Sequence, residues 1–274
     1  MKKSDPPASP EYLRVAELIR ERIRDGTWVP GQRIPAAPAL AEELGSDRSA
    51  CERAVRVVAM QGLLTTKQGS GAYVSRILHK IRRDGTSRYQ KAKREEATAD
   101  GGQARGAFEA ELRRMGLIPR NMPSVRRAVP PAEIAEILGV NPQAESVLVR
   151  DRRMYAAPAD AAPEDLGTPV QIATTYIPLD IAGGTVLENY DTGPGGMISR
   201  LAEMGHLQVR IEETIEDREP TPDEAKFLML DQRNRVFEIT HLARTEQGRI
   251  VEATVHVLPT SMWQLSYGWD IDDN

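Results

Sequence analysis

The sequence is short of the residues that build disulfides, metal sites and membrane spans. Its 274 residues include one cysteine and four histidines, and only 5% of them are aromatic. The single cysteine, Cys51, excludes a disulfide within the chain, and its place on the apolar side of a predicted helix indicates ordinary packing. No apolar run approaches the length of a membrane span, and the first ten residues lack the apolar core of a signal peptide. We therefore expect a cytoplasmic protein without a membrane partner.

Known catalytic and metal-binding patterns are missing as well. The chain contains no GxSxG and no phosphate-binding GxxxxGK, and its histidines have neither HxxxH nor His/Cys spacing. These histidines are His79, His206, His241 and His256. We interpret His256, on a strand near the C-terminus, as a packing or dimer-contact residue rather than a catalytic base. The sequence thus predicts no catalytic residue, no metal ligand and no cofactor.

Charge is unevenly distributed along the chain. The net charge is −4, yet residues 1–94 hold 19 Lys and Arg against 10 Asp and Glu, whereas the remainder holds 17 against 30. The two parts therefore carry +9 and −13. Such asymmetry is typical of a basic nucleic-acid-binding module joined to an acidic domain. An acidic surface also serves solubility alone, so the charge supports nucleic-acid binding without deciding it.

The pattern of residues 10–74 predicts three helices and a tight β-hairpin. Apolar residues recur at helical spacing from Pro10 to Gly26, from Pro38 to Gly45 and from Ser46 to about Gln61. The third helix has apolar residues on one half and polar residues on the other. A helix with arginines and a small hydroxyl on its free face, set after a four-residue turn, fits a DNA major groove. The polar half consists of Arg48, Ser49, Glu52, Arg53 and Arg56.

The hairpin that follows is expected to form a wing. Leu63–Thr66 and Ala72–Val74 are strand-like and flank a basic, glycine-bearing tip at Lys67–Gly71. A helix with an arginine face is by itself more often a solvated surface than a DNA reader. The whole order of helix, turn, charged helix and glycine-tipped hairpin is more demanding, and it predicts a winged helix-turn-helix.

Further residues of this stretch match a known pattern. They are Tyr12, Pro30–Pro35, Leu40-Ala41, Leu44-Gly45, Arg48, Ala54, Gly62-Leu63 and Gln68–Gly71. With them the stretch resembles the DNA-binding domain of the GntR family of bacterial transcription regulators, which implies a double-stranded DNA operator as partner. The residues expected to contact DNA are Arg33, Arg48, Ser49, Glu52, Arg53, Lys67, Gln68, Gly69, Ser70 and Gly71.

Two positions depart from that family. Its members usually have Ser or Thr after the proline at Pro35 and a phosphate-gripping Arg two residues later, but this chain has Ala36 and Pro38. Loss of the helix cap is expected to cost roughly 1 kcal/mol. The position of Glu52 is often Arg in the family. A carboxylate there either repels phosphate or accepts a hydrogen bond from a cytosine amine, and Arg53 is then available for the backbone contact.

From Gly106 onward, helical and strand-like segments are interspersed without a strict β-α-β rhythm. This pattern favours an α+β fold with a largely antiparallel sheet. Helices are predicted at 107–115, 131–138, 197–204 and 222–230, and strands at 147–155, 170–177, 207–215, 236–243 and 250–258.

Six stretches of this second part occur in a familiar order. They are PAEIAEILGV, VLVRDRRMYA, TPVQIATTYIP, ISRLAEMG, TPDEAKFLML and GRIVEATV. The part resembles the UTRA effector-binding domain of the HutC branch of the GntR family. The resemblance implies a chorismate-lyase-like fold, a small-molecule effector and a homodimer, and it places polar effector contacts at Arg152 and Glu252. The alternative role of Arg152 is a surface salt bridge, which would be worth little.

Two further sets of residues are candidates for effector contacts. Gly106, Ala107 and Phe108 open a helix whose free N–H groups suit an anion, although relatives often have Ser where this chain has Ala107. Thr174 and Tyr176 are two apart on a strand and so project from one face of the sheet. A cleft of this composition suits a polar, partly anionic molecule, for which a sugar phosphate, an amino acid and a carboxylate metabolite are all open choices.

The predicted function is a DNA-binding transcription regulator, a repressor whose operator binding changes with a small polar effector. Two alternatives stay open: a regulator of plasmid transfer or maintenance without a metabolite effector, and an enzyme built on the lyase-like domain, for which a winged helix would be unnecessary. The predicted layout is a disordered N-terminus at 1–9, a winged helix-turn-helix at 10–75, a basic linker at 76–103, a UTRA-like effector-binding and dimerisation domain at 104–266 and an acidic tail at 267–274.

Overall fold

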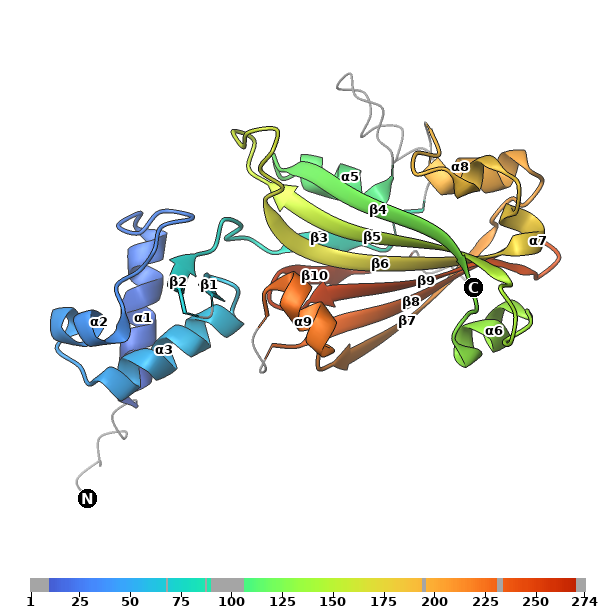
Figure 1. Cartoon of the computed structure of the whole chain (residues 1–274). Coiled ribbons are helices and arrows are strands. Elements are labelled where there is room, and N and C mark those ends of the chain that lie inside the picture. The colour runs from blue at the N-terminus through green and yellow to red at the C-terminus, as the bar shows by residue number, and fades with distance from the viewer. Residues whose placement is uncertain are drawn as a thin grey trace, which may run out of the picture. The chain divides into compact units, whose positions relative to one another are not determined.

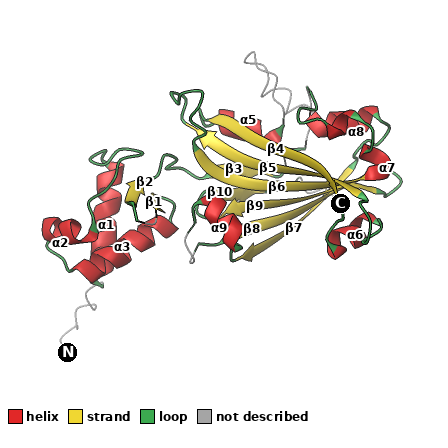
Figure 2. Cartoon of the chain, in the orientation of Figure 1, coloured by secondary structure: helices red, strands yellow, loops and turns green. Residues whose placement is uncertain are grey.

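The chain divides into two compact units, each with its own hydrophobic core. The first unit comprises Met1–Lys80 together with Met229–Asn234, and the second comprises Ile81–Leu228 together with Arg235–Asn274. Figure 1 labels their elements, and Figure 2 separates helices from strands. The computed structural model describes residues 10–67, 69–86, 88–89, 106–193, 196–230 and 234–269.

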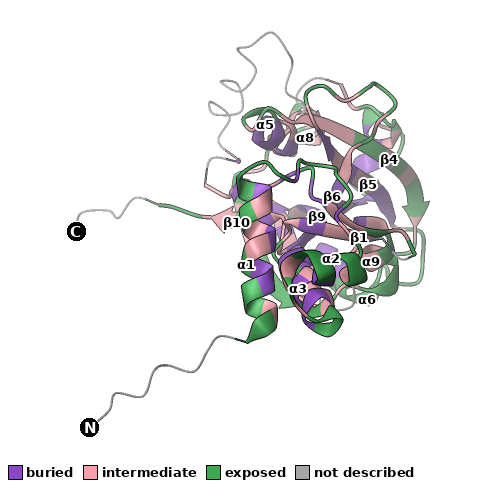
Figure 3. Cartoon of the chain, turned by 90° about the vertical axis from the view of Figure 1, so that its left-hand side faces the viewer, coloured by how far each residue is buried: buried purple, intermediate pink, exposed green. Residues whose placement is uncertain are grey.

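Three helices form the body of the first unit: α1 (Glu11–Arg24), α2 (Ala37–Leu44) and α3 (Arg48–Met60). The apolar stripe of α1 is buried against α3, as the buried side of α1 in Figure 3 shows. The unit's core gathers apolar residues from all three helices, with Trp28 and Ile34 from the connection between α1 and α2. The predicted helices are therefore confirmed to within one or two residues at their ends.

The two shorter helices begin differently. The side chain of Asp47 caps α3 by accepting a hydrogen bond of 2.8 Å from the N–H of Ala50. The residue before α2, Ala36, makes no side-chain cap, as its side chain lacks an acceptor. Between the helices Gly45 has φ +58°, a left-handed conformation that glycine adopts without steric cost.

A two-stranded antiparallel wing completes the first unit. Its strands are β1 (Leu64–Lys67) and β2 (Gly71–Val74), with Leu64 opposite Val74. Arg33, from the connection before α2, forms an antiparallel bridge with Tyr73 on the other side of β2. The wing thus adds its strands to the three helices, and the predicted winged helix-turn-helix is confirmed.

The second unit is built on a six-stranded antiparallel sheet with the order β4-β5-β6-β9-β8-β7. The long central strands pair over most of their length, so Arg152 of β5 lies opposite Ala173 of β6, which in turn lies opposite His256 of β9. The strands are β4 (Ile118–Ala128), β5 (Val147–Ala157), β6 (Thr168–Pro178), β7 (Arg210–Arg218), β8 (Val236–Arg244) and β9 (Ile250–Pro259).

Alternation along β5 sends its side chains to two different environments. Val147 and Val149 pack beneath α6 (Ala132–Leu138), and Tyr155 meets Phe227 of α9 (Pro222–Leu228) edge to face. The even-numbered residues of β5 face the opposite side of the sheet. That side is covered by α5 (Ala107–Arg113), α7 (Leu179–Ala182), the 3-10 turn η1 (Val186–Glu188) and α8 (Gly196–Glu203).

The pattern analysis did not predict β4. This edge strand contains Pro119 and Pro123 and alternates between half-buried and exposed residues, so it lacks the apolar signal of its neighbours. Proline cannot donate to a sheet ladder and is tolerated at an edge, where one side of the strand needs no partner. The prolines of β4 are therefore compatible with an edge strand, but the segment lacks the alternating apolar residues by which a strand is usually recognised in a sequence.

The predicted basic linker at 76–103 is wrong where the structure describes it. Residues Ile81–Asp84 form strand β3, which pairs in parallel with β10 (Trp263–Ser266) in the second unit. Burial of Ile81 and Arg83 explains why this basic stretch is ordered structure rather than a solvated spacer. The predicted layout lies outside the described residues at 1–9 and 90–103.

The predicted tail at 267–274 also begins too early. The Tyr267 hydroxyl donates a hydrogen bond to Glu213, and the Gly268 N–H donates one of 2.6 Å to Thr86. These contacts continue the second unit beyond β10; residues 270–274 lie outside the described part. Among the described residues, no helix is both long enough and apolar enough to cross a membrane.

Candidate functional site

The free face of α3 presents the first group of predicted site residues. Arg48 has 70% of its side chain exposed, and its Nε donates a hydrogen bond of 2.7 Å to Oε1 of Glu52, one turn later on the same face. The Ser49 hydroxyl donates one of 2.7 Å to Asp47, the cap of the helix. Arg48 and Glu52 thus form one polar unit, in which the carboxylate orients the guanidinium.

The other predicted DNA-contacting residues have different surroundings. The guanidinium of Arg53 lies 3.8 Å from the ring centroid of Tyr12 on α1, a cation–π contact. Arg33 lies beside the wing, where a side chain at Gly71 would approach its Nε to 3.1 Å. The Lys67 side chain and Gln68 lie outside the described part.

Glycine is required at the wing tip. Gly69 and Gly71 have φ of +72° and +103°, in the region that other residues rarely adopt. Ser70 between them makes a hydrogen bond of 2.8 Å with the Tyr73 hydroxyl. This contact holds the tip against β2, and Gly69 and Gly71 on either side of Ser70 are exposed.

The second unit contains a cavity of about 820 Å³ on the face of the sheet that carries α5 and α8. Its polar lining comes from the sheet, from residues just after β3, from α5 and from the segment after η1. Its apolar lining includes Phe108, Met154 and Ile198. The principal polar residues around it are Arg88, Tyr89, Arg150, Arg152, Gln171, His241, Glu252 and His256.

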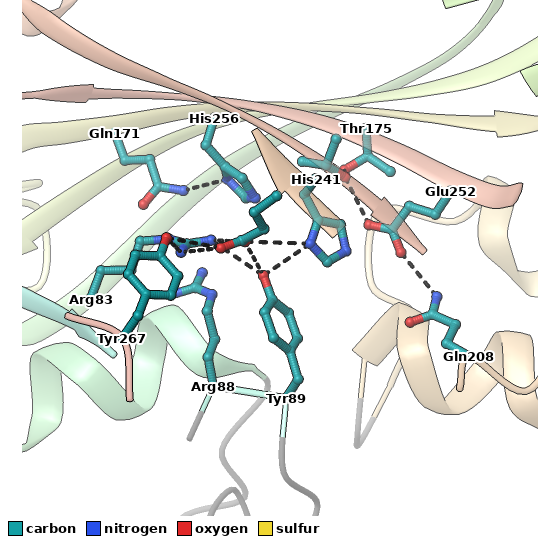
Figure 4. Close-up of polar contacts among 12 residues, drawn as sticks. Arg83, Arg88, Tyr89, Gln171, Thr175, Gln208, His241, Glu252, His256 and Tyr267 are labelled. Atoms are coloured by element: carbon teal, nitrogen blue, oxygen red, sulfur yellow. Dashed lines mark hydrogen bonds and ion pairs between the residues drawn. The ribbon is translucent and has the colours of Figure 1, made fainter. Parts of the chain in front are cut away.

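A chain of hydrogen bonds crosses the cavity floor, as Figure 4 shows in part. Arg152 Nη2 donates to the Thr175 hydroxyl at 2.8 Å, and the two threonines Thr175 and Thr254 are 2.7 Å apart. Thr254 donates to Glu252 at 2.7 Å, and Gln208 Nε2 donates to the same carboxylate at 3.0 Å. Burial lowers the pKa of Arg152, which remains a cation because the pKa of arginine starts so high.

Arg150, two residues earlier on the same face, has a structural role. Its guanidinium donates three hydrogen bonds, to the carbonyl oxygens of Leu187, Asn189 and Tyr190, at 2.5 to 3.0 Å. Burial lowers its pKa as well. These bonds fix the segment after η1, so the cavity wall formed by Tyr190 and its neighbours is held by the sheet.

A buried ion pair adjoins the cavity. The Arg83 guanidinium makes two hydrogen bonds with the carboxylate of Glu213 on β7, and their side chains are 1% and 7% exposed. Burial by itself raises the pKa of Glu213, but the hydrogen bonds from Arg83, His241 and Tyr89, together with the charge of Arg83, outweigh burial and hold this pKa well below the usual range. The same carboxylate accepts from the hydroxyls of Tyr89 at 2.6 Å and Tyr267 at 3.0 Å (Figure 4).

Tyr89 connects this ion pair to the cavity. Its ring stacks on His241 with centroids 5.0 Å apart, and its hydroxyl lies 3.0 Å from His241 Nδ1. The preceding Arg88 makes two bonds of 2.5 Å with the buried Glu111 of α5. Since Arg88, Tyr89 and His241 all line the cavity, its wall contains the segment that begins at β3. We call the described residues of this segment, 81–86 and 88–89, the strap.

The structure places five of the seven predicted effector residues around one cavity. Arg152, Glu252 and the helix start Gly106–Phe108 line it. Thr174 and Tyr176 do share a face, but it is the opposite one: Thr174 donates to Asp151 and Tyr176 packs under α6. Their predicted place in the cleft is therefore wrong, because the side of β6 that faces the cavity is that of Gln171 and Thr175.

Several cavity residues were missed by the sequence analysis. Thr175 stands on the cavity floor where Thr174 was expected, and a one-residue shift is enough to exchange the faces. Arg88 and Tyr89 lay in the segment predicted as a linker. Gln171 lay at the second residue of the predicted strand 170–177, where no motif singled it out. His241 and His256 gave no spacing signal, because strand pairing rather than sequence distance brings them within 6.3 Å, ring to ring. No group of His, Cys, Asp or Glu in the described residues is arranged to hold a metal ion.

Comparison with known proteins settles the family. A family model for bacterial regulatory proteins of the GntR family matches residues 11–74, and a model for the UTRA domain matches residues 122–264, more than half of the chain. The chain belongs to the GntR family. Its UTRA domain and its similarity to histidine utilization repressors make it a regulator of the HutC type, a DNA-binding transcription regulator.

Relatives of this GntR-family regulator differ in how much of it they match. An uncharacterized HTH-type transcriptional regulator of Streptomyces coelicolor is 28% identical over 98% of this chain and 96% of its own length. The histidine utilization repressor of Pseudomonas putida is 39% identical, but over 24% of this chain and 27% of its own. That shorter match spans 67 residues.

Solved structures agree on the fold. A putative GntR-family transcriptional regulator superposes with a TM-score of 0.55 at 23% identity, covering 96% of this chain and 99% of that one. PhnF from Mycobacterium smegmatis also gives a TM-score of 0.55, at 20% identity, with 94% and 99% covered.

Replacement of Arg48 by Ala should weaken operator binding of this GntR-family regulator. If Arg48 pairs with a guanine, as its exposed and oriented guanidinium suggests, the loss should be about 1–3 kcal/mol on the operator and little on random DNA. Fluorescence anisotropy at fixed salt measures both. Arg24→Ala, which removes an exposed arginine of α1 that pairs with Glu17, is the charge-matched control. Equal losses for the two variants would contradict the assignment.

The stability of the UTRA domain should fall in mild acid because of His256. Burial, and then the charges of Arg83 and Arg88, lower the pKa of His256 well below 6.5. The unfolded chain therefore takes up a proton before the folded one does, so this contribution is present above pH 6.5 and is lost as the pH falls towards the folded pKa. Denaturant unfolding should lose up to about 1.4 kcal/mol per pH unit there. His256→Gln should flatten this slope, and an unchanged slope would refute the assignment.

Proposed function

We propose that this regulator is a dimeric repressor whose operator binding is changed by a small polar effector bound in the cavity of the UTRA domain. The observation that carries the effector part is the cavity itself. It is large enough for a metabolite, and it has charged side chains on a rigid sheet floor. We assign no enzymatic activity to the chain.

The DNA-binding part of the proposal rests on α3 and the wing. Arg48 is exposed and held by Glu52, and this pairing suits a guanidinium that reads guanine in a major groove. Arg53 stacks on Tyr12, so in this role it supports α3 more than it reaches bases. Gly69, Ser70 and Gly71 put backbone N–H groups at the wing tip, where they suit a phosphate.

Dimerisation is proposed from the needs of DNA reading. One chain carries one recognition helix, and a two-fold dimer on a pseudo-palindrome doubles the contacts without a second gene product. Among the described residues, β4 and β7 are the two edge strands of the sheet of the UTRA domain, and an edge strand presents N–H and C=O groups with which another strand can pair. These edges are candidate surfaces for a second copy of the chain.

Operator binding by full-length protein tests the proposal. We expect a gel shift on DNA from upstream of the protein's own coding region, with a two-fold symmetric footprint. Metabolites that raise the melting temperature should then weaken the operator complex by about 5–150-fold, the usual range of allosteric coupling. Arg152→Ala should abolish this response and leave operator affinity unchanged. An unsymmetrical half-site footprint from monomers, or a normal response in the Arg152 variant, would count against the proposal.

The strap offers a route from the cavity to the DNA-binding unit. It follows that unit directly in the chain, and the Arg83–Glu213 and Arg88–Glu111 ion pairs fix it in the UTRA domain. Tyr89 lines the cavity and bonds to Glu213, so a ligand that moves Tyr89 disturbs the bonds that hold Arg83. We propose that the effector acts on operator affinity through these contacts.

Loosening the strap should imitate the effector without any ligand. Arg83→Met leaves the Glu213 carboxylate buried and without its counter-ion, which costs roughly 3–5 kcal/mol of stability. Operator affinity should fall about 5–150-fold even though α3 is untouched. Tyr89→Phe removes the hydroxyl that bonds to Glu213 and should give a smaller loss in the same direction. Anisotropy titrations well below the melting temperature measure both variants.

Arg218→Met is the matched control for the strap. Arg218 lies on β7, the strand of Glu213, and its replacement breaks ion pairs with Glu224 of α9 and Glu238 of β8, neither of which is in the strap. If Arg83→Met and Arg218→Met lower the melting temperature but both keep wild-type operator affinity, the strap is a structural anchor only.

A further inference from the structure

The cavity floor carries two charges of opposite sign, neither of which is in an ion pair. Within the part of the chain that the structure describes, no carboxylate lies within 4.0 Å of the Arg152 guanidinium, and no cationic group lies that close to the Glu252 carboxylate. Arg152 donates to a hydroxyl alone, and its Nε has no partner among the described residues. Glu252 is 5% exposed and accepts from an amide and a hydroxyl.

Three buried arginines nearby have their partners within the protein, and one of them, Arg150, donates to three backbone carbonyl oxygens. Arg83 pairs with Glu213, and Arg88 pairs with Glu111, each through two hydrogen bonds. A charge taken out of water without a counter-ion costs several kcal/mol in general. The half-buried Arg152 and the buried Glu252 are therefore a couple that a ligand can stabilise.

The two threonines keep Arg152 and Glu252 apart. The Thr254 hydroxyl gives its one proton to Glu252, so towards Thr175 it can only accept. Thr175 therefore donates to Thr254 and accepts from Arg152, and the chain runs in one direction from the cation to the anion. Both ends keep unused capacity, N–H donors on Arg152 and lone pairs on Glu252.

We propose that the cavity binds a small zwitterion, with its anionic group at Arg152 and its ammonium group at Glu252. This inference rests on the proposed function and specifies the effector's chemistry. A ligand of one sign pairs one end of the floor and leaves the other uncompensated, whereas a zwitterion satisfies both.

The rest of the lining selects among zwitterions. Beside the charged floor lie Phe108, Pro119, Met154, Met197 and Ile198, and these supply apolar surface for a carbon side chain. An amino acid with an apolar side chain uses this surface as well as the two charges. An aminoalkyl phosphate shares the charges but buries less apolar area, so it should bind less tightly.

The test uses two sets of three probes in titration calorimetry with full-length protein. The first set is L-leucine, its α-hydroxy acid and isoamylamine; the second is phosphoethanolamine, ethyl phosphate and ethanolamine. Each set compares a zwitterion with a molecule that has lost the ammonium group and one that has lost the anion. Leucine should bind tightest, about tenfold to a hundredfold better than its two analogues, since a hydrogen bond to a charged group is worth that much. Thermal shift with the common amino acids then ranks other side chains.

Variants assign each charge to its partner. Glu252→Gln should remove the preference for leucine over the hydroxy acid, and Arg152→Met should remove the preference for leucine over the amine. Thr174→Val, which alters the opposite face of the same sheet, should retain both preferences.

The outcomes separate this inference from the proposed function. No binding of any common amino acid or of phosphoethanolamine at millimolar concentration, or a preference that survives Glu252→Gln, overturns the zwitterion. If a metabolite without an ammonium group releases the operator, the proposed function stands and the zwitterion falls. If a zwitterion binds as described but leaves operator affinity unchanged, the ligand class stands and its regulatory role falls.

Discussion

The buried carboxylate of Glu213 is the constraint on which the UTRA domain depends. It stands on β7, at the edge of the sheet, and it is charged at a position where charge is costly. Its compensation comes from three separate parts of the chain: Arg83 in β3, Tyr89 after it, and Tyr267 after β10. Each donor must be in place for the ion to be tolerated. The strap and the C-terminal strand are thereby fixed to the sheet by this ion as well as by the buried side chains of Ile81 and Trp263.

Because of this arrangement, a movement of the strap changes the cavity wall, and a change in the cavity wall moves the strap. Tyr89 uses one hydroxyl for both Glu213 and His241, and His241 belongs to the cavity wall. Such shared partners couple neighbouring sites more strongly than independent contacts do. The two buried ion pairs of the strap differ in place, with Arg88–Glu111 tied to α5 and Arg83–Glu213 tied to β7. A change in the cavity therefore acts on the strap from two sides.

The sequence predicts those elements whose signal is local, and it fails for those that depend on residues distant in the chain. The helices of the first unit and the strands β5, β6, β8 and β9 have local apolar periodicity, which is readable without knowledge of their neighbours. The strand β3 reads as a basic spacer, because Arg83 is buried by a partner 130 residues away. Likewise Thr174 and Thr175 are indistinguishable by type, and only the register of β5 and β6 decides which of them reaches Arg152. Arg152 and Glu252 were found through family resemblance, whereas the threonines between them required the structure.

The burial of Arg83 and Arg88 also changes what the positive charge of residues 1–94 implies about DNA binding. The surplus of +9 over residues 1–94 suggests a strongly basic DNA-binding module, but part of it is neutralised inside the UTRA domain. Residues 1–80 hold 13 Lys and Arg against 9 Asp and Glu, a surplus of only +4. On α1 several of these arginines are already paired, among them Arg14 with Glu11 and Arg20 with Glu17. A weak overall field gives little non-specific attraction to phosphate, so discrimination between DNA sequences depends more heavily on α3 and the wing. The Arg48–Glu52 pair matters for that reason. Because few unpaired cations attract DNA in general, affinity depends on the individual guanidinium groups that reach bases, and Glu52 orients that of Arg48 in advance.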